Sequence, residues 1–154
     1  MKIQLSELDR KILRAVQDNS ARSMAELGNV VGLSASACHR RLKSLEDRGL
    51  IAGYGATLDR RQLGFAMQFF IEVSLVSQSE PVLEAFENAV RAIPEILECH
   101  LMAGQSDYIL RVVCRDAEAF AQLHRELVAR LPGIARVHSN MSIREVKPYA
   151  GLPV

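Results

Sequence analysis

No run of apolar residues in the sequence approaches the ~18 residues of a membrane-spanning helix. Residues 1–4 lead directly into polar, helix-forming sequence, without the apolar core of a signal peptide. Cysteine is scarce too: Cys38, Cys99 and Cys114 cannot all pair with one another, and none stands in a Cys-x-x-Cys motif. We therefore expect a cytoplasmic protein without membrane contact, whose cysteines are reduced thiols in its cores.

The sequence also lacks the signatures of several enzyme classes. It contains no Ser-His-Asp signature, no phosphate-binding Walker loop and no His-Glu-x-x-His metal motif. His39 has no second metal ligand one helical turn away, and the other histidines are scattered without a repeated spacing. We therefore expect no catalytic residues, no metal site and no cofactor.

What the chain does have is enough apolar sequence for real cores. At 154 residues, of which 49% are hydrophobic, it can form one ordinary domain or two small ones. Its net charge is only +1, but residues 1–50 carry nine Lys/Arg against six Asp/Glu, whereas residues 61–154 carry nine against eleven. This uneven distribution favours contact between the N-terminal part and a polyanion.

Two stretches in the first third of the chain match the capping box that begins a helix. In Ser6-Glu7-Leu8-Asp9 and in Ser23-Met24-Ala25-Glu26, a serine precedes an acidic residue by three positions. The two side chains can then satisfy the free backbone N–H groups of a first helical turn. Apolar residues follow each box at helical spacing. The sequence therefore predicts two amphipathic helices here.

A third helix is predicted over residues 35–48, after a turn at Gly32-Leu33-Ser34. Its inner face carries Cys38, Leu42 and Leu45, and its outer face is small and basic. A helix with a basic outer face after a short turn has the geometry that enters a DNA major groove. A solvated face of a three-helix bundle is the alternative. The residues that we expect to contact double-stranded DNA are Ser34, Ser36, His39, Arg40, Arg41 and Lys43.

Gly49 ends the third helix, and residues 50–58 form a glycine-interrupted extended pattern that is typical of the wing of a winged helix. A polar hinge follows at residues 59–62. We therefore expect a winged helix-turn-helix domain at residues 1–52, a linker at 53–62 and a second domain at 63–154.

The second domain alternates strands and helices. The pattern predicts strands at residues 65–76, 96–103, 108–114 and 137–146, and helices at 81–93 and 117–131. This βαββαβ order is that of a ferredoxin-like domain, an antiparallel sheet with two helices on one face, so the fold class is α+β. We expect the other sheet face to be apolar and covered by another copy of the chain.

Several segments, in this order and spacing, resemble the Lrp/AsnC family of transcription regulators over nearly the whole chain. In the first half these are Leu8-Asp9-Arg10-Lys11-Ile12-Leu13, Val31-Gly32-Leu33-Ser34, residues 41–51 and Gly53-Tyr54. In the second half they are residues 98–104, Asp107-Tyr108-Ile109-Leu110-Arg111, Leu131-Pro132-Gly133 and Glu145-Val146-Lys147.

The resemblance implies a sequence-specific DNA-binding regulator that forms homodimers through its C-terminal domain, often assembled into octamers, and responds to an amino acid or a related metabolite. It places the effector between dimers, near the turn after the second strand and the last strand. The effector-binding residues it implies are Leu101, Gly104, Gln105, Ser106, Asp107, Asn140, Met141 and Ser142. The turn offers independent support, because glycine permits close approach to backbone N–H groups and Asp107 can accept from an ammonium. An ordinary β-turn is the alternative.

Two other functions are compatible with a similar fold. Tetrapyrrole decarboxylases use histidines to hold their substrate, and His100, His124 and His138 are the candidates for that role. A chromosome-organising protein that wraps DNA with little sequence preference is the other possibility. The basic third helix favours both DNA-binding functions over the enzyme.

Overall fold

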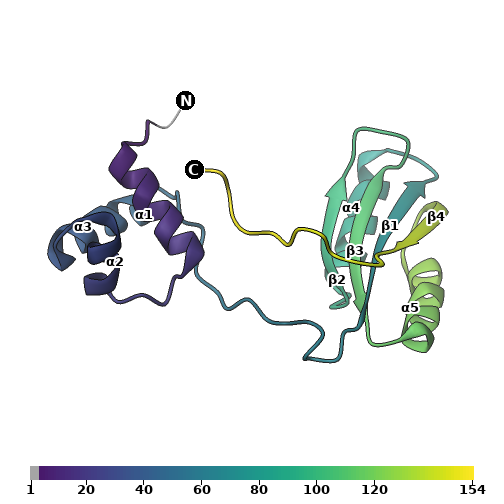
Figure 1. Cartoon of the computed structure of the whole chain (residues 1–154). Helices are drawn as coiled ribbons and strands as arrows, with labels where there is room; N and C mark the ends of the chain where they lie inside the picture. The colour runs from purple at the N-terminus through teal and green to yellow at the C-terminus, as the bar shows by residue number, and fades with distance from the viewer. Residues whose placement is uncertain (1–3) are drawn as a thin grey trace. The chain divides into compact units, whose positions relative to one another are not determined.

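The computed structural model describes residues 4–154, so residues 1–3 of the predicted N-terminal domain lie outside the description. The chain divides into two compact units, each with its own core (Figure 1). The helices of the N-terminal unit are α1 (Glu7–Asp18), α2 (Met24–Val31) and α3 (Ala35–Asp47). Their inner faces pack together, and Ile12, Leu27, Cys38 and Leu45 are almost completely buried between them.

Capping boxes begin the first two helices, as predicted. The Ser6 hydroxyl accepts from the Asp9 backbone N–H (3.1 Å), and the Asp9 carboxylate accepts from the Ser6 N–H (3.2 Å). Ser23 and Glu26 exchange the same two bonds at α2 (3.2 and 2.7 Å). Both predicted boxes are confirmed.

The turn between α2 and α3 depends on two glycines. Gly32 ends α2 with φ of 76°, a left-handed conformation that favours glycine. Gly28 lies one turn earlier, where a Cβ atom would come within 2.5 Å of the Leu33 carbonyl oxygen. The backbone after α2 can therefore fold back closely on that helix, which positions the start of α3.

The C-terminal unit has the predicted ferredoxin-like topology. Its elements are β1 (Met67–Leu75), α4 (Glu80–Arg91), β2 (Ile96–Leu101), β3 (Tyr108–Cys114), α5 (Ala117–Arg130) and β4 (Ile134–Met141). The strands form one antiparallel sheet in the order β2-β3-β1-β4, which is the ferredoxin-like arrangement. In the described part of the chain, no helix is long and apolar enough to cross a membrane.

Helices α4 and α5 cover one face of this sheet. Alternate residues of β1 point to the helices, because side chains alternate between the faces of a strand. Ile71 of β1 is completely buried with Phe86 of α4 and Leu127 of α5. The ring of Phe69 stacks on that of Phe120, with centroids 3.6 Å apart. The other sheet face is left free of helices.

The last strand differs from the prediction for residues 137–146. Strand β4 begins three residues earlier and ends at Met141, which pairs with Phe69 of β1. Strand β4 lies at the edge of the sheet and pairs with β1, which begins at Met67. The Ser142 N–H still donates to the Gln68 carbonyl oxygen (2.8 Å), next to the first residue of β1. The strand therefore ends near the start of its partner, although apolar residues follow at Ile143 and Val146.

The expected wing is also different. Residues 51–59 have no assigned strand, and a turn follows at residues 60–64. A wing needs a second strand to pair with, and no strand within residues 4–154 pairs with this segment. Tyr54 instead anchors it, because its hydroxyl donates to the Glu46 carboxylate of α3 (2.7 Å).

The C-terminal tail departs from the expected domain at residues 63–154. The compact C-terminal unit is Leu58–Glu145, and Val146–Val154 belongs with the N-terminal helices. The chain therefore passes between the units twice, once near Thr57 and once near Glu145. Sequence patterns assign segments by their neighbours along the chain, so they miss this return.

Candidate nucleic-acid interface and ligand site

The outer face of α3 is the surface that the sequence assigns to DNA. Its inner face is fixed by Cys38, Leu42 and Leu45, all buried in the core. Positions that follow one another by three or four residues therefore share the opposite face. Ser36, His39, Arg40 and Lys43 lie there, and all four are exposed. The structure thus brings together four of the six predicted residues.

Ser34 acts through the backbone of α3. It is the N-cap of the helix, and its hydroxyl accepts from the Ala37 N–H (3.3 Å) and lies 3.3 Å from the Ser36 hydroxyl. These bonds fix where the helix begins. Free N–H groups at a helix start favour an anion such as a DNA phosphate.

Arg41 is turned away from the other cations, toward α1. Its guanidinium forms an ion pair with the Asp9 carboxylate at 2.9 Å. The hydrogen bonds from Ser6, opposed by burial and aided by Arg41, hold the pKa of Asp9 below its ordinary value. Arg41 therefore braces α3 against α1. Sequence reasoning missed this role, because nothing along the chain links residue 41 with residue 9.

Lys43 and Arg40 differ in their surroundings. Lys43 pairs with Asp47 at 2.9 Å on the exposed surface, and the hydrogen bond to Asp47 raises the pKa of the lysine. An exposed pair of this kind is weak, so a phosphate can replace the carboxylate. Arg40 makes no ion pair with any of residues 4–154. Its guanidinium is therefore the free bidentate donor of the helix.

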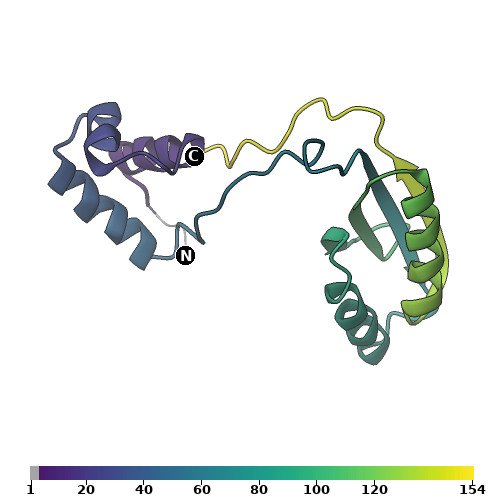
Figure 2. The ribbon, with the colours of Figure 1, turned by 90° about the horizontal axis from the view of Figure 1, so that it is seen from below.

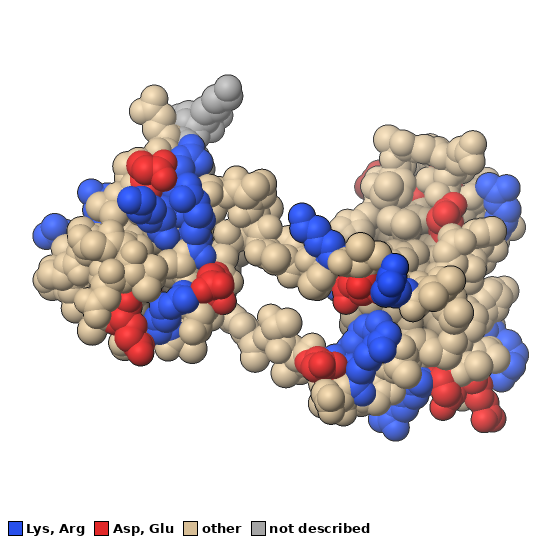
Figure 3. Space-filling model, in the orientation of Figure 1, with Lys and Arg blue, Asp and Glu red and all other residues tan. Residues whose placement is uncertain are grey.

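Basic side chains also gather over α1, as Figure 3 shows for the N-terminal unit. This helix contains Arg10, Lys11 and Arg14, and the last two are exposed. The charge of the unit therefore extends beyond α3. None of these three residues is among those that the sequence predicts to contact DNA.

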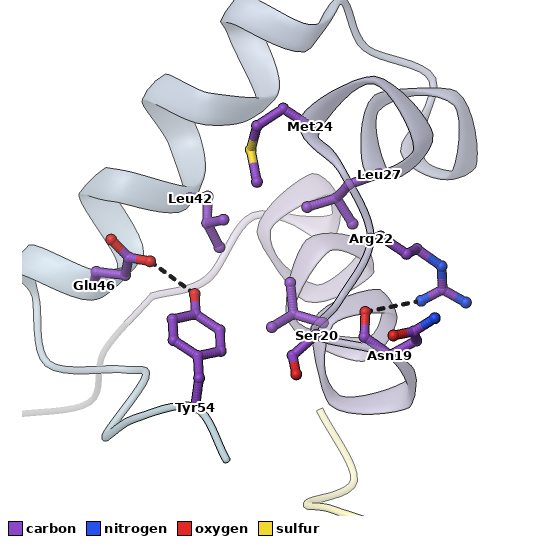
Figure 4. Close-up of a pocket in the computed structure, with 9 residues that line it drawn as sticks. Asn19, Ser20, Arg22, Met24, Leu27, Leu42, Glu46 and Tyr54 are labelled. Carbon is purple, nitrogen blue, oxygen red and sulfur yellow. Dashed lines mark hydrogen bonds between the residues drawn. The ribbon is translucent and has the colours of Figure 1, made fainter. Parts of the chain in front are cut away.

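A cavity of about 220 Å³ lies behind α3 in the N-terminal unit (Figure 4). Met24, Leu27 and Leu42 form its apolar wall, and the Tyr54–Glu46 hydrogen bond lies at its edge. Partial burial and the bond to Glu46 raise the pKa of Tyr54 to about 12, so the phenol stays protonated. The tyrosine thereby packs the segment after α3 against the helix.

The second candidate site is the turn between β2 and β3. Leu101, Gly104 and Gln105 are exposed there, and Ser106 is half-buried. A Cβ atom on Gly104 would meet nothing within 4 Å, and the residue is not in the positive-φ region. The fold of the chain therefore does not require glycine at position 104. Because the residue is exposed and has open space around it, its backbone is accessible to an outside molecule.

Asp107 is buried beneath this turn rather than open in it. Its carboxylate accepts from the Leu75 N–H (2.7 Å) and from the Gln78 side-chain amide (2.6 Å). The Asp107 N–H donates to the Val73 carbonyl oxygen (2.9 Å). Asp107 therefore fastens the turn to the end of β1. Any ammonium that it binds must share a carboxylate with these two donors.

The last-strand candidates do not lie near this turn in a single chain. Tyr108, next to Asp107, pairs with Val73 of β1, whereas Met141 pairs with Phe69. Those β1 positions are four residues, or about 13 Å, apart along the strand, and β3 and β4 flank opposite edges of β1. The exposed residues Asn140 and Met141 and the half-buried Ser142 thus form a separate group. One chain does not assemble the predicted effector site.

The helix-free face of the sheet is more polar than we expected. By strand alternation its residues are Gln68, Phe70, Glu72, Ser74, Glu98, His100, Ile109, Arg111, Val113, Arg136, His138 and Asn140. Arg111 pairs with Glu98 at 2.6 Å, and Asn140 donates to Glu72 at 3.3 Å. The expectation of an apolar face is therefore wrong. Apolar side chains contribute only a patch around Phe70.

The histidines proposed for a tetrapyrrole site are not clustered. His100 lies on edge strand β2, 3.5 Å from Glu98, and His138 lies on the opposite edge strand, 3.1 Å from Asn140. His124 is on α5, beside the ring of Phe120, on the helix-covered face. This placement gives no pair of histidines that could hold one substrate.

The cysteines are poor nucleophiles in this fold. Cys38 and Cys114 are buried and Cys99 is partly buried. Burial raises the pKa of all three thiols, to about 11 for Cys99. Thiolates are therefore scarce at neutral pH.

Two family models match the chain. The model described as Lrp/AsnC ligand binding domain matches residues 68–152. The model described as winged helix-turn-helix DNA-binding matches residues 5–52. The boundary between the two matches falls between α3 and β1.

Known proteins resemble the chain over most of its length. It is 49% identical over 116 residues to a helix-turn-helix transcriptional regulator of Sinorhizobium fredii, covering 75% of this chain and 91% of that protein. It is 37% identical over 143 residues to the leucine-responsive regulatory protein of Escherichia coli, covering 93% of this chain and 87% of that protein. A transcriptional regulator of Neisseria meningitidis, solved in complex with L-Met, superposes with a TM-score of 0.92 at 34% identity, covering 97% of each chain.

Proposed function

Because the chain belongs to the Lrp/AsnC family of transcription regulators, we propose that it binds specific sites on double-stranded DNA through α3 and responds to an amino acid through its C-terminal unit. The observation that carries the DNA-binding part is the outer face of α3, where His39, Arg40 and Lys43 are exposed together. Arg40 contacts a base, because its guanidinium is unpaired, and Lys43 exchanges Asp47 for a phosphate.

The effector is an amino acid or a close relative. The regulator of Neisseria meningitidis is described in complex with L-Met, and the Escherichia coli protein is named leucine-responsive. The open backbone at Gly104 can receive a carboxylate. Asn140, Met141 and Ser142 cannot join it within one chain, so a second copy supplies one of the two groups. We therefore infer that the chain acts as a homodimer or a larger homo-oligomer, such as an octamer.

The divided effector site fits regulation through assembly. A ligand that contacts two copies binds the assembled form better than the separate copies, so it shifts the equilibrium between them. The number or spacing of N-terminal units presented to DNA then changes with the effector. A protein of this kind regulates transcription, does not catalyse a reaction, and acts in the cytoplasm, as expected for a relative of bacterial DNA-binding regulators.

The test is a selection of bound fragments from the source genome, repeated with and without each of the twenty amino acids. We expect a small set of fragments that share a motif, and a changed affinity for them with at least one amino acid. Uniform recovery of fragments without a motif would favour the chromosome-wrapping function. A purified protein with the absorbance band of a tetrapyrrole would favour the decarboxylase.

A further inference from the structure

The end of the C-terminal tail lies on helix α1 of the N-terminal unit, as both ribbon views show (Figures 1 and 2). The Gln17 side-chain amide donates to the Leu152 carbonyl oxygen (3.1 Å) and accepts from the Leu152 N–H (2.6 Å). Arg14 Nε donates to the Val154 carbonyl oxygen (2.6 Å). Two side chains of α1 thus hold the backbone of the tail.

The contact also has a fitted shape. Gly151 has φ of 97°, and a Cβ atom there would lie 2.5 Å from Oε1 and 2.8 Å from Cδ of Gln17. Any other residue at 151 would be strained and would push the amide away. Val154 packs against the core of the N-terminal unit. The docking therefore depends on glycine at 151 and on an apolar residue three positions later.

We propose that residues 151–154 form a strap, docked on Arg14 and Gln17 of the same chain, that tethers the N-terminal unit a second time. The first tether is the segment after Thr57, and the second leaves the C-terminal unit at Glu145. The second tether starts just beyond β4, whose end carries Asn140 and Met141.

The strap matters for a protein that places two N-terminal units on one DNA site, a consequence that rests on the proposed function. A unit held by two tethers explores a smaller volume than a unit held by one. Its effective concentration at the second half-site is therefore higher once the first half-site is bound. Releasing the strap lowers the affinity for paired half-sites and leaves the affinity for a single half-site unchanged.

The docking is tested without DNA by hydrogen exchange of the full chain, measured by mass spectrometry. Two variants release the strap in different ways: Gly151→Ala displaces the Gln17 amide, and Gln17→Ala removes it. Alanine is at least as good a helix former as glutamine, so α1 itself is not weakened. The matched control is Gly53→Ala, since Gly53 has open space around it and no positive φ.

We expect peptides from residues 146–154 to exchange about threefold to tenfold faster in both variants, because one net hydrogen bond changes an opening equilibrium by about that factor. The control exchanges like the wild type. Unchanged exchange in both variants overturns the strap. Protection that falls on dilution of the wild type also overturns it, because the tail on α1 would then come from a partner copy.

The consequence is tested by fluorescence anisotropy with the best fragment from the genomic selection and with the same fragment after one half-site is scrambled. We expect both variants to bind the intact fragment about threefold to tenfold more weakly than the control, with equal affinities for the scrambled one. If the variants exchange faster in the tail but bind each fragment with the same affinity as the control, the tethering role is overturned. If the wild type binds no DNA, the proposed function fails, and the exchange result alone decides whether the strap docks.

Discussion

The guanidinium of Arg41 on α3 lies 2.9 Å from the carboxylate of Asp9 on α1, and this ion pair joins the first turn of one helix to the middle of another. The same carboxylate closes the capping box with Ser6. One aspartate therefore fixes both the start of α1 and the position of α3 against α1. The outward cations Arg40 and Lys43 take no part in this contact.

Arg41→Ala should lower the free energy of unfolding of the N-terminal unit by about 1 kcal/mol, since the pair is only partly exposed to water. Urea unfolding followed by circular dichroism measures this loss. The matched control is Lys43→Ala, whose pair with Asp47 lies on the exposed surface and should contribute clearly less stability than the pair of Arg41. Equal losses in the two variants would show that Arg41 does not brace the helix.

Asp9 gives the unit a defined pH dependence. The Ser6 hydrogen bonds, with Arg41, lower the pKa of the folded-state carboxyl below its ordinary value of 3.8. The ionised Asp9 carboxylate therefore stabilises the folded unit fully when the pH is above the ordinary pKa. This stabilisation is lost as the pH falls through the lower pKa of the folded state. The free energy of unfolding of the wild type should exceed that of Asp9→Asn by a constant amount between about pH 5 and about pH 7, and the difference should shrink below about pH 4. A pH-independent difference would contradict this assignment.

Local chemistry explains which parts of the fold the sequence could predict. Ser6 and Ser23 with their acidic partners, and Gly32, act within a few residues, so their effects can be seen along the chain. The end of β4 could not be predicted, because it depends on where β1 begins, more than sixty residues earlier. Gln17 and Leu152 are similar: two ordinary residues become partners only when the chain folds back.

The candidate sites divide in the same way. The outer face of α3 follows from helical periodicity and was predicted, except for Arg41, whose partner lies on another helix. Asp107 was placed correctly in the turn, but its bonds to Leu75 and Gln78 depend on tertiary packing. The separation of Asn140 from this turn follows from strand order, which the order of elements along the chain does not state.

Arg40→Ala should weaken binding to the best DNA site by about 1–3 kcal/mol and relax sequence preference, as expected for loss of a bidentate base contact. Lys43→Ala should weaken binding to all DNA sequences by a similar factor. It should also reduce by about 1 the slope of the logarithm of affinity against the logarithm of salt concentration, as expected for one lost phosphate contact. Titrations of matched and scrambled sites at several salt concentrations separate the two effects. Unchanged affinity in both variants would exclude the outer face of α3 as the DNA contact.

Asp107→Ala should destabilise the C-terminal unit by about 1–3 kcal/mol, because it leaves the buried Leu75 N–H without an acceptor. Asp107→Asn keeps an oxygen for that N–H, removes the charge, and places an NH2 group where the second oxygen accepted from Gln78. The Gln78 amide can turn its own oxygen toward that NH2 group, so the variant should retain most of the stability. Thermal unfolding measures both changes. If Asn restores stability but not the response to an amino acid, the charge of Asp107 binds the effector; if it restores both, the residue only fastens the turn.

Gly104→Ala tests the effector site with the fold kept constant. The position has open space and no positive φ, so the melting temperature without ligand should stay the same. An added methyl group there should obstruct close approach of a carboxylate to the backbone.

An amino acid at a hundred times its dissociation constant should stabilise the wild type by about 2.7 kcal/mol, which raises the melting temperature by roughly 5–10 °C for a chain of this size. The shift should be clearly smaller for Gly104→Ala and full for the control Gly55→Ala, whose glycine is equally open but lies in the segment after α3. Equal shifts in all three proteins would place the effector away from the turn between β2 and β3, and the group at Asn140, Met141 and Ser142 would then be the place to search.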